Sequence, residues 1–336
     1  NISQNNDYWK TYGFTVNQIE SILKNYLRLE KFLQAYSNNI PQNLSHSSEK
    51  LYIFCLKYYS GCKKITSLNL QKFSIMRMVY IIDEIEKMTN VKFERAKDIY
   101  LNRCKYYDSE RDIFVEAKKI IIMIHNFINK NYGKYIELPN PTSISIKSLP
   151  NLKAIWGSPC RSYGNTIFIN EYYWYKVDKN ELIRSLVHEF IYMIESINNK
   201  KKQITVIKEG VAIYFSEIIK SLYCHDNDLF ILFIQLDNIV RSIVDTAINS
   251  NDVHIKLSTN SAINFIEKYS IIKMPEAEIL KSLSKPAKNA CCDLGYYMVK
   301  KYGDTSKIDN HELAKHIFKN PIKMKHLYNF YESNLK

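Results

Sequence analysis

A histidine and a glutamate stand side by side in an apolar segment, residues 180–195, whose pattern predicts a helix. Tyr192 follows His188 by four residues, and residues four apart lie on one face of a helix. An imidazole and an ionised phenol on one face could hold a metal ion, and Glu189 could take a proton from metal-bound water. The phenol is the weaker donor, because its pKa is about 10 unless a dication lowers it.

A second His-Glu pair in the same chain provides an internal comparison. His311-Glu312 is followed by His316, five residues after the first histidine, so these two imidazoles face different ways on a helix. A His-Glu pair on a helix is more often an exposed polar pair than a metal site. The dipeptide is therefore weak evidence without support from its flanks.

The flanking segments carry a family resemblance. A second apolar helix opens after Lys208 with a Glu-Gly pair, and residues 292–304 combine a helix with a Tyr-Gly step. The order and spacing of these segments resemble the gluzincins, the thermolysin-like branch of zinc peptidases, over roughly residues 140–320. Their third-ligand helix has the pattern E-G-x-A-x-Y, matched here by Glu209, Gly210, Ala212 and Tyr214.

The resemblance implies a zinc site and a peptide-hydrolysing mechanism. His188, Glu209 and, in place of the usual second histidine, Tyr192 would surround Zn²⁺, with Glu189 as the general base. The sequence departs from the family at Tyr192, and three interpretations stay open. Tyr192 is a weaker ligand, or the site is inactivated and binds zinc poorly or not at all, or the likeness is structural only, with another histidine near the site.

Further roles follow from the resemblance and from spacing. Tyr296 or Tyr297 would stabilise the oxyanion, with Tyr296 preferred. Glu195 shares the helix face of His188, and its carboxylate could accept a hydrogen bond from the imidazole and so orient it toward the metal. The segment 165–170 reads as a strand that resembles the family's substrate-pairing edge strand, so a peptide would add along it. The substrate-binding residues on this strand would be Asn165, Ile167 and Ile169.

Two functions from different classes therefore compete. The first is a zinc metallopeptidase that hydrolyses peptides or proteins, and the second is a non-catalytic protein that keeps the fold and binds a peptide or protein partner. A third, nucleic-acid binding, is suggested by the net charge of +13, from 47 Lys and Arg against 34 Asp and Glu. The basic residues are scattered along the chain, which disfavours a nucleic-acid partner. No nucleotide-binding glycine motif and no G-x-S-x-G element is present.

The elements that must position these residues indicate an α+β fold. Helical periodicity over the first third of the chain predicts a helical N-terminal domain, 1–135, built from segments at 17–36, 51–59, 70–88, 93–106 and 112–131. Prolines at 139, 141 and 150 then forbid a helix, and alternation at 143–147 predicts a strand. The second domain, 136–336, is expected to hold a small sheet followed by helices. Gly157 and Gly164 flank a loop that contains Cys160 and Arg161.

Composition limits the setting of the protein. Seven cysteines without a C-x-x-C motif exclude a complete disulfide framework. No apolar run is long enough to predict a transmembrane helix. The chain begins at Asn1 without Met, which is consistent with a removed signal peptide and equally with a cut chain, so a secreted location is only weakly favoured. The oligomeric state is not indicated.

Overall fold

The computed structural model describes residues 67–103, 112–148, 160–170, 179–198, 205–219, 222, 228–249, 257–271, 287–306 and 309–319. The predicted segments 17–36 and 51–59 lie outside these ranges. The helices are α4 (Ser67–Thr89), α5 (Phe93–Arg103), α6 (Ile113–Tyr132), α8 (Lys179–Asn198), α9 (Thr205–Ile218), α10 (Asp228–Ile248), α11 (Thr259–Tyr269), α13 (Lys288–Ser306) and α14 (Asn310–Lys319), with a 3₁₀ turn at Pro141–Ser143. With the sheet described below, they confirm the α+β class.

The helix α6 illustrates how the local sequence sets these elements. Asp112 caps its start, because its carboxylate accepts hydrogen bonds from the backbone N–H groups of Phe114 and Val115. Its buried side chains recur every three or four residues: Ile113, Ala117, Ile120, Ile121, Ile124, Ile128 and Tyr132. The helix therefore presents one continuous apolar face to the core.

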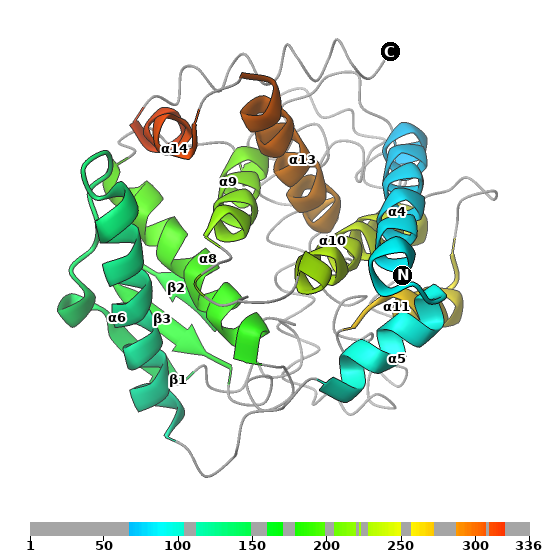
Figure 1. Ribbon diagram of the computed structural model, residues 1–336, viewed down its shortest axis with the longest axis horizontal. Coiled ribbons are helices and arrows are strands. Elements are labelled where there is room, and N and C mark those ends of the chain that lie inside the picture. Colours follow the sequence, from blue (N-terminus) through cyan, green and yellow to red (C-terminus); the bar gives the residue numbers. More distant parts are fainter. Residues whose placement is uncertain are drawn as a thin grey trace, which may run out of the picture.

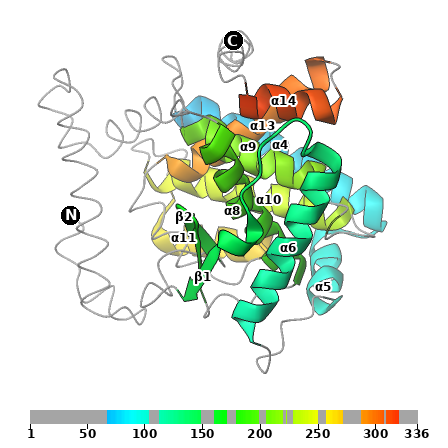
Figure 2. The same ribbon diagram turned by 90° about the vertical axis from the view of Figure 1, so that its left-hand side faces the viewer.

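The sheet has three short strands, β1 (Ser145–Ser148), β2 (Cys160–Tyr163) and β3 (Thr166–Ile169). Their order is β1-β3-β2, with β3 parallel to β1 and antiparallel to β2. Helices α6 and α8 cover one face, α6 over β1 and α8 over β2 (Figures 1 and 2). The predicted strand 165–170 is therefore the central strand of the described sheet, and the expectation that it forms an open edge is wrong.

The remaining helices stack beside α8. Figure 1 shows the succession α8, α9, α13, α10 and α4, and the contacts between neighbours follow the same order. One buried apolar core runs through the described residues from Leu70 to Phe318. Residues 67–135 share this core with the rest of the chain, so packing is continuous across the predicted boundary at 135/136. For residues 1–66, the predicted N-terminal domain lies outside the described ranges.

Helices α9 and α13 approach each other closely at two glycines. A Cβ atom built on Gly210 would lie 2.2 Å from both the carbonyl carbon and the oxygen of Gly295. Only glycine allows two backbones to approach this closely. The contact fixes the start of α9, and with it Glu209, against the first turns of α13.

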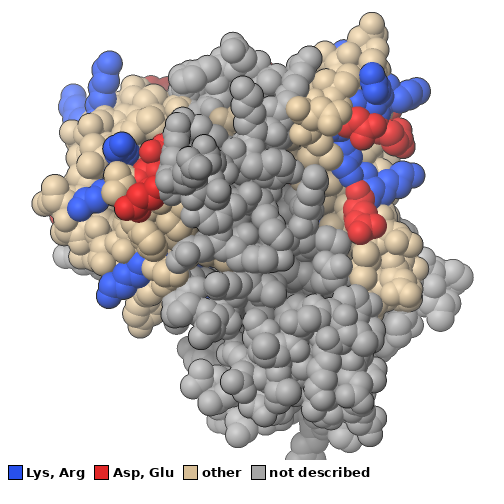
Figure 3. Space-filling model, turned by 90° about the horizontal axis from the view of Figure 1, so that it is seen from below, with Lys and Arg blue, Asp and Glu red and all other residues tan. Residues whose placement is uncertain are grey.

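Within the described residues, no helix is long and apolar enough to cross a membrane. On the face shown in Figure 3, basic and acidic side chains lie next to each other on the described parts of the surface. The positive net charge is therefore not concentrated in one patch there.

Candidate functional site

A cavity of about 460 Å³ lies among β2, α8, α9, α10 and α13. Its volume is in the range of small-ligand sites. The charged residues that line it are five permanent cations and three carboxylates, namely Arg161, Arg184, Lys208, Arg241 and Lys288 against Glu181, Glu189 and Glu209. Cations thus outnumber carboxylates on the wall of the cavity.

Glu209 is the centre of a polar cluster on this wall. Its Oε2 lies 3.7 Å from Nε2 of His188, and its Oε1 lies 3.3 Å from Nζ of Lys288. The hydroxyl of Tyr192 also donates a hydrogen bond to Glu209. His188 and Tyr192 stand edge to face with ring centroids 4.7 Å apart. The structure thus brings together His188, Tyr192 and Glu209, which the resemblance named as a ligand set, and adds Lys288 to them.

The protonation states of this cluster follow from its contacts. Burial opposes ionisation of Glu209, but the charge of Lys288 and hydrogen bonds from His188 and Tyr192 hold its pKa well below the usual value. Burial, and then the charge of Glu209, raise the pKa of Tyr192 well above that of a free phenol. The charge of Glu209 raises the pKa of Lys288. Glu209 is therefore a carboxylate neutralised by an ammonium group, and Tyr192 keeps its proton.

Glu189, the general base that the resemblance implied, is hydrogen-bonded to the sheet. Its Oε2 accepts hydrogen bonds of 2.6 Å from both the backbone N–H and the hydroxyl of Ser162 in β2. The side chain is 7 % exposed. Glu189 thus ties α8 to the outer edge of the sheet. A peptide that added along β2 would have to displace this carboxylate from the strand's N–H group.

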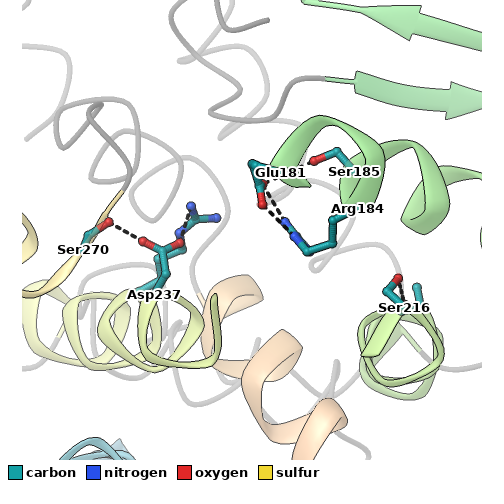
Figure 4. Close-up of polar contacts among 8 residues, drawn as sticks. Glu181, Arg184, Ser185, Ser216, Asp237 and Ser270 are labelled. Carbon is teal, nitrogen blue, oxygen red and sulfur yellow. Dashed lines mark hydrogen bonds and ion pairs between the residues drawn. The ribbon is translucent and has the colours of Figure 1, made fainter. Parts of the chain in front are cut away.

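Two guanidinium groups of the lining are held in place by carboxylates (Figure 4). Arg184 donates through Nε and Nη2 to the two oxygens of Glu181, each at 2.7 Å. Nη2 of Arg241 lies 2.6 Å from Oδ2 of Asp237, whose Oδ1 accepts from the hydroxyl of Ser270. The fork-like pairing of Arg184 fixes the orientation of its guanidinium, and the ion pair with Asp237 restrains that of Arg241. These cations are therefore positioned before any ligand arrives.

Lys208 of α9 and Arg161 of β2 add further positive charge to the cavity wall. Nζ of Lys208 lies 4.5 Å from the centroid of the Tyr192 ring, which is cation–π distance. Arg161 is part of β2, although the sequence placed it in a loop. Burial lowers the pKa of Arg161, and the carboxylates of Glu189 and Glu209 oppose that change.

Other predicted site residues lie away from the cavity or in the core. The hydroxyl of Tyr296 donates to Glu217, which also accepts from Lys300, so Tyr296 is engaged between α9 and α13. Ile167 and Ile169 are fully buried. Asn165 sits in the turn between β2 and β3. None of these four lines the described cavity, so the oxyanion and substrate roles expected for them have no support in its geometry.

Glu195 is also outside the cavity lining. Its side chain is 5 % exposed, and its Oε2 has no hydrogen-bond partner among the residues that the structure describes. Burial raises its pKa to about 7, against an opposing effect of Lys208. The folded state therefore keeps this proton at pH values where the unfolded chain has lost it.

Replacing Glu195 by Gln should remove a pH-dependent loss of stability. The pKa of Glu195 is about 7 in the folded state, and its ordinary value is 4.5. The contribution of Glu195 to the free energy of unfolding therefore falls as pH rises from about 4.5 to about 7. We expect the free energy of unfolding of Glu195→Gln to equal that of the parent near pH 5. Near pH 8 it should be higher than that of the parent by on the order of 2 kcal/mol. Urea unfolding at both pH values measures this, with the exposed Glu267→Gln as control. A difference independent of pH would contradict the assignment.

Several residues of this cavity were not singled out from the sequence. Lys288 occupies the first turn of α13, which the sequence resolved only from residue 292 onward. Arg241 lies on α10, where nothing in the spacing relates it to His188. Ser162 carried no signal, because its acceptor Glu189 comes from another element. Lys208 could have been considered from the sequence, because it directly precedes Glu209, which was already a candidate.

Comparisons with known proteins show the fold and nothing more specific. No known family profile and no curated protein sequence matches the chain. A "putative lipoprotein" from Colwellia psychrerythraea has a similar structure, with a TM-score of 0.65, 15% identity and coverage of 84% of this chain and 55% of that one. A "putative lipoprotein of unknown function" from Shewanella oneidensis gives a TM-score of 0.62 at 13% identity, covering 84% and 59%. The chain thus spans somewhat more than half the length of each.

These findings correct the gluzincin resemblance. The similar structures are described as lipoproteins, one of them of unknown function, and neither as a peptidase. Among the described residues, no group of three or more His, Cys, Asp or Glu side chains is arranged to hold a metal ion. The physical reason lies in the cluster itself, where Lys288 supplies the positive charge beside Glu209 and Ser162 engages Glu189. The likeness to the HExxH helix is a likeness of sequence alone.

Proposed function

We propose that the chain is a non-catalytic binding protein that acts outside the cytoplasm and holds an acidic group of a peptide partner in its cavity. The observation that carries this proposal is the excess of fixed cations over carboxylates on the cavity wall. Buried carboxylates there already have partners, as Glu181 has Arg184 and Glu209 has Lys288. A ligand carboxylate would gain charge-assisted hydrogen bonds from groups that are already oriented.

The location and the absence of cleavage have separate support. Both similar structures are described as lipoproteins, a class held outside the cytoplasm. Glu189 is bonded to the edge of β2, and the Tyr192 hydroxyl is bonded to Glu209. Neither is arranged as the base or the donor that hydrolysis of a bound peptide would need.

The test compares peptides that differ only in charge. The 336-residue chain is dialysed against two libraries of acetylated, amidated tetrapeptides, one with a fixed aspartate and one with asparagine in its place. Mass spectrometry quantifies bound peptides and any shorter products. We expect retention of aspartate peptides, no retention of asparagine peptides and no cleavage. Equal retention of both libraries, peptide cleavage, or stoichiometric zinc in the purified protein would overturn the proposal.

Variants place the binding in the cavity. Arg161→Gln and Lys208→Gln each remove one lining cation, and we expect each to weaken aspartate-peptide binding by about tenfold, as for a hydrogen bond to a charged group. Lys147→Gln removes the same charge from an exposed position on β1 and should leave affinity within about twofold. Titration calorimetry measures all three. Equal losses in all variants would indicate a general effect of net charge instead.

A further inference from the structure

Tyr163 lines the cavity and also exposes its side chain to solvent. It is one of the lining residues, yet its side chain is 84 % exposed, the largest fraction among the exposed large apolar residues that the structure describes. Its neighbours in β2, Arg161 and Ser162, also line the cavity. The exposed ring of Tyr163 therefore lies on the same wall as Arg161, within reach of a ligand whose acidic group enters the cavity.

The backbone that carries Tyr163 is held firmly. Tyr163 pairs with Thr166 across the two-residue turn Gly164-Asn165, and Gly164 has φ of 56°, a value that glycine adopts without strain. The backbone N–H of Ser145 donates to the carbonyl of Asn165 at 2.9 Å, which anchors the turn to β1. The exposure of the ring is thus a property of an anchored hairpin. A tyrosine on an anchored backbone has only two side-chain torsions to fix, so it loses little entropy on binding.

We infer that the partner carries an aromatic side chain next to its acidic residue and packs this ring on Tyr163 while the acid lies in the cavity. This inference rests on the proposed function and specifies its ligand. An aromatic pair gains stability beyond the area it buries, and tyrosines at the rim of a site are frequent anchors of binding energy. The ligand class is therefore an acidic-aromatic peptide.

The experiment is a cycle of protein and peptide changes. Titration calorimetry compares acetylated, amidated Ala-Phe-Asp-Ala with Ala-Ala-Asp-Ala on the parent, Tyr163→Ala and Tyr163→Phe. We expect Tyr163→Ala to weaken the Phe peptide about fivefold, to leave the Ala peptide within about twofold, and Tyr163→Phe to retain parental binding. Tyr80→Ala is the matched control, since Tyr80 is 62 % exposed on α4 and does not line the cavity.

The outcomes separate this inference from the proposed function. If both peptides bind with the expected dependence on Arg161 but Tyr163→Ala weakens neither or both equally, the aromatic preference is overturned and the acid-binding cavity stands. If neither peptide binds the parent, the proposed function and this inference both fail. If Tyr163→Phe lost as much affinity for the Phe peptide as Tyr163→Ala, the hydroxyl group and not the ring contact would account for binding, and the inference would be overturned.

Discussion

Replacing Gly210 by alanine should destabilise the protein strongly, by about 3 kcal/mol or more. The added Cβ would lie 2.2 Å from the backbone of Gly295, and a backbone cannot rotate away as a flexible side chain can. Helices α9 and α13 must therefore separate, which weakens the core around both. For a chain of 336 residues, whose unfolding entropy is about 2.1 cal/mol/K per residue, we expect the melting temperature to fall by roughly 4 °C or more, measured by circular dichroism.

Gly164→Ala is the control for this prediction. Gly164 also needs its glycine, because of its φ of 56°, but a Cβ there would meet nothing within 4 Å. We expect only the conformational cost, about 1 kcal/mol. If Gly210→Ala cost no more than Gly164→Ala, the close approach of α9 and α13 would be wrong.

Replacing Arg77 by methionine should cost roughly 3–5 kcal/mol. Nη1 of Arg77 lies 2.6 Å from Oδ1 of Asp293, and the Asp293 side chain is 0 % exposed. The pair joins α4 to α13, and the guanidinium also lies over the rings of Tyr296 and Tyr297. Without Arg77, Asp293 is left as a buried charge with no counter-ion from α4. Urea unfolding near neutral pH measures the loss.

The pH dependence of this loss identifies its cause. Burial raises the pKa of Asp293 and Arg77 opposes the rise, so Arg77→Met should raise this pKa further. A raised carboxyl pKa gives stability that is present at low pH and lost as pH rises through the folded value. The variant should therefore approach the parent as pH falls. Arg77→Met combined with Asp293→Asn should recover part of the loss at neutral pH, and a pH-independent deficit would point to lost packing alone.

Regular periodicity made several elements predictable. The helical patterns at 70–88 and 112–131 correspond to α4 and α6, and the alternation at 143–147 overlaps β1. The strand β2 was missed, because Cys-Arg-Ser-Tyr contains no β-branched residue and one of its two polar side chains turns toward Glu189. Because β2 pairs with β3, the strand predicted at 165–170 is the central strand of the described sheet and not an edge strand.

The family resemblance was wrong for a reason visible in the packing. In the E-G-x-A-x-Y match, Gly210 is required by its contact with Gly295, and Ala212 is fully buried. Tyr214 packs against Gly303, where a Cβ would lie 2.7 Å from the phenolic oxygen. Helix packing therefore accounts for Gly210, Ala212 and Tyr214 at these positions, and it would do so without any zinc site. Lys288, which decides the charge of the site, lies in a different segment and could not be paired with Glu209 from sequence.

The continuous core also determines when the chain can fold. Helix α4 is synthesised early, but Ser74 bonds to Ser242 and Arg77 to Asp293, partners that follow 168 and 216 residues later. Contacts across such separations form slowly, because the intervening chain must be closed into a loop first. An emerging polypeptide therefore holds α4 without its partners until α10 and α13 have left the ribosome. The core of the described residues therefore cannot be completed before α13 has been synthesised.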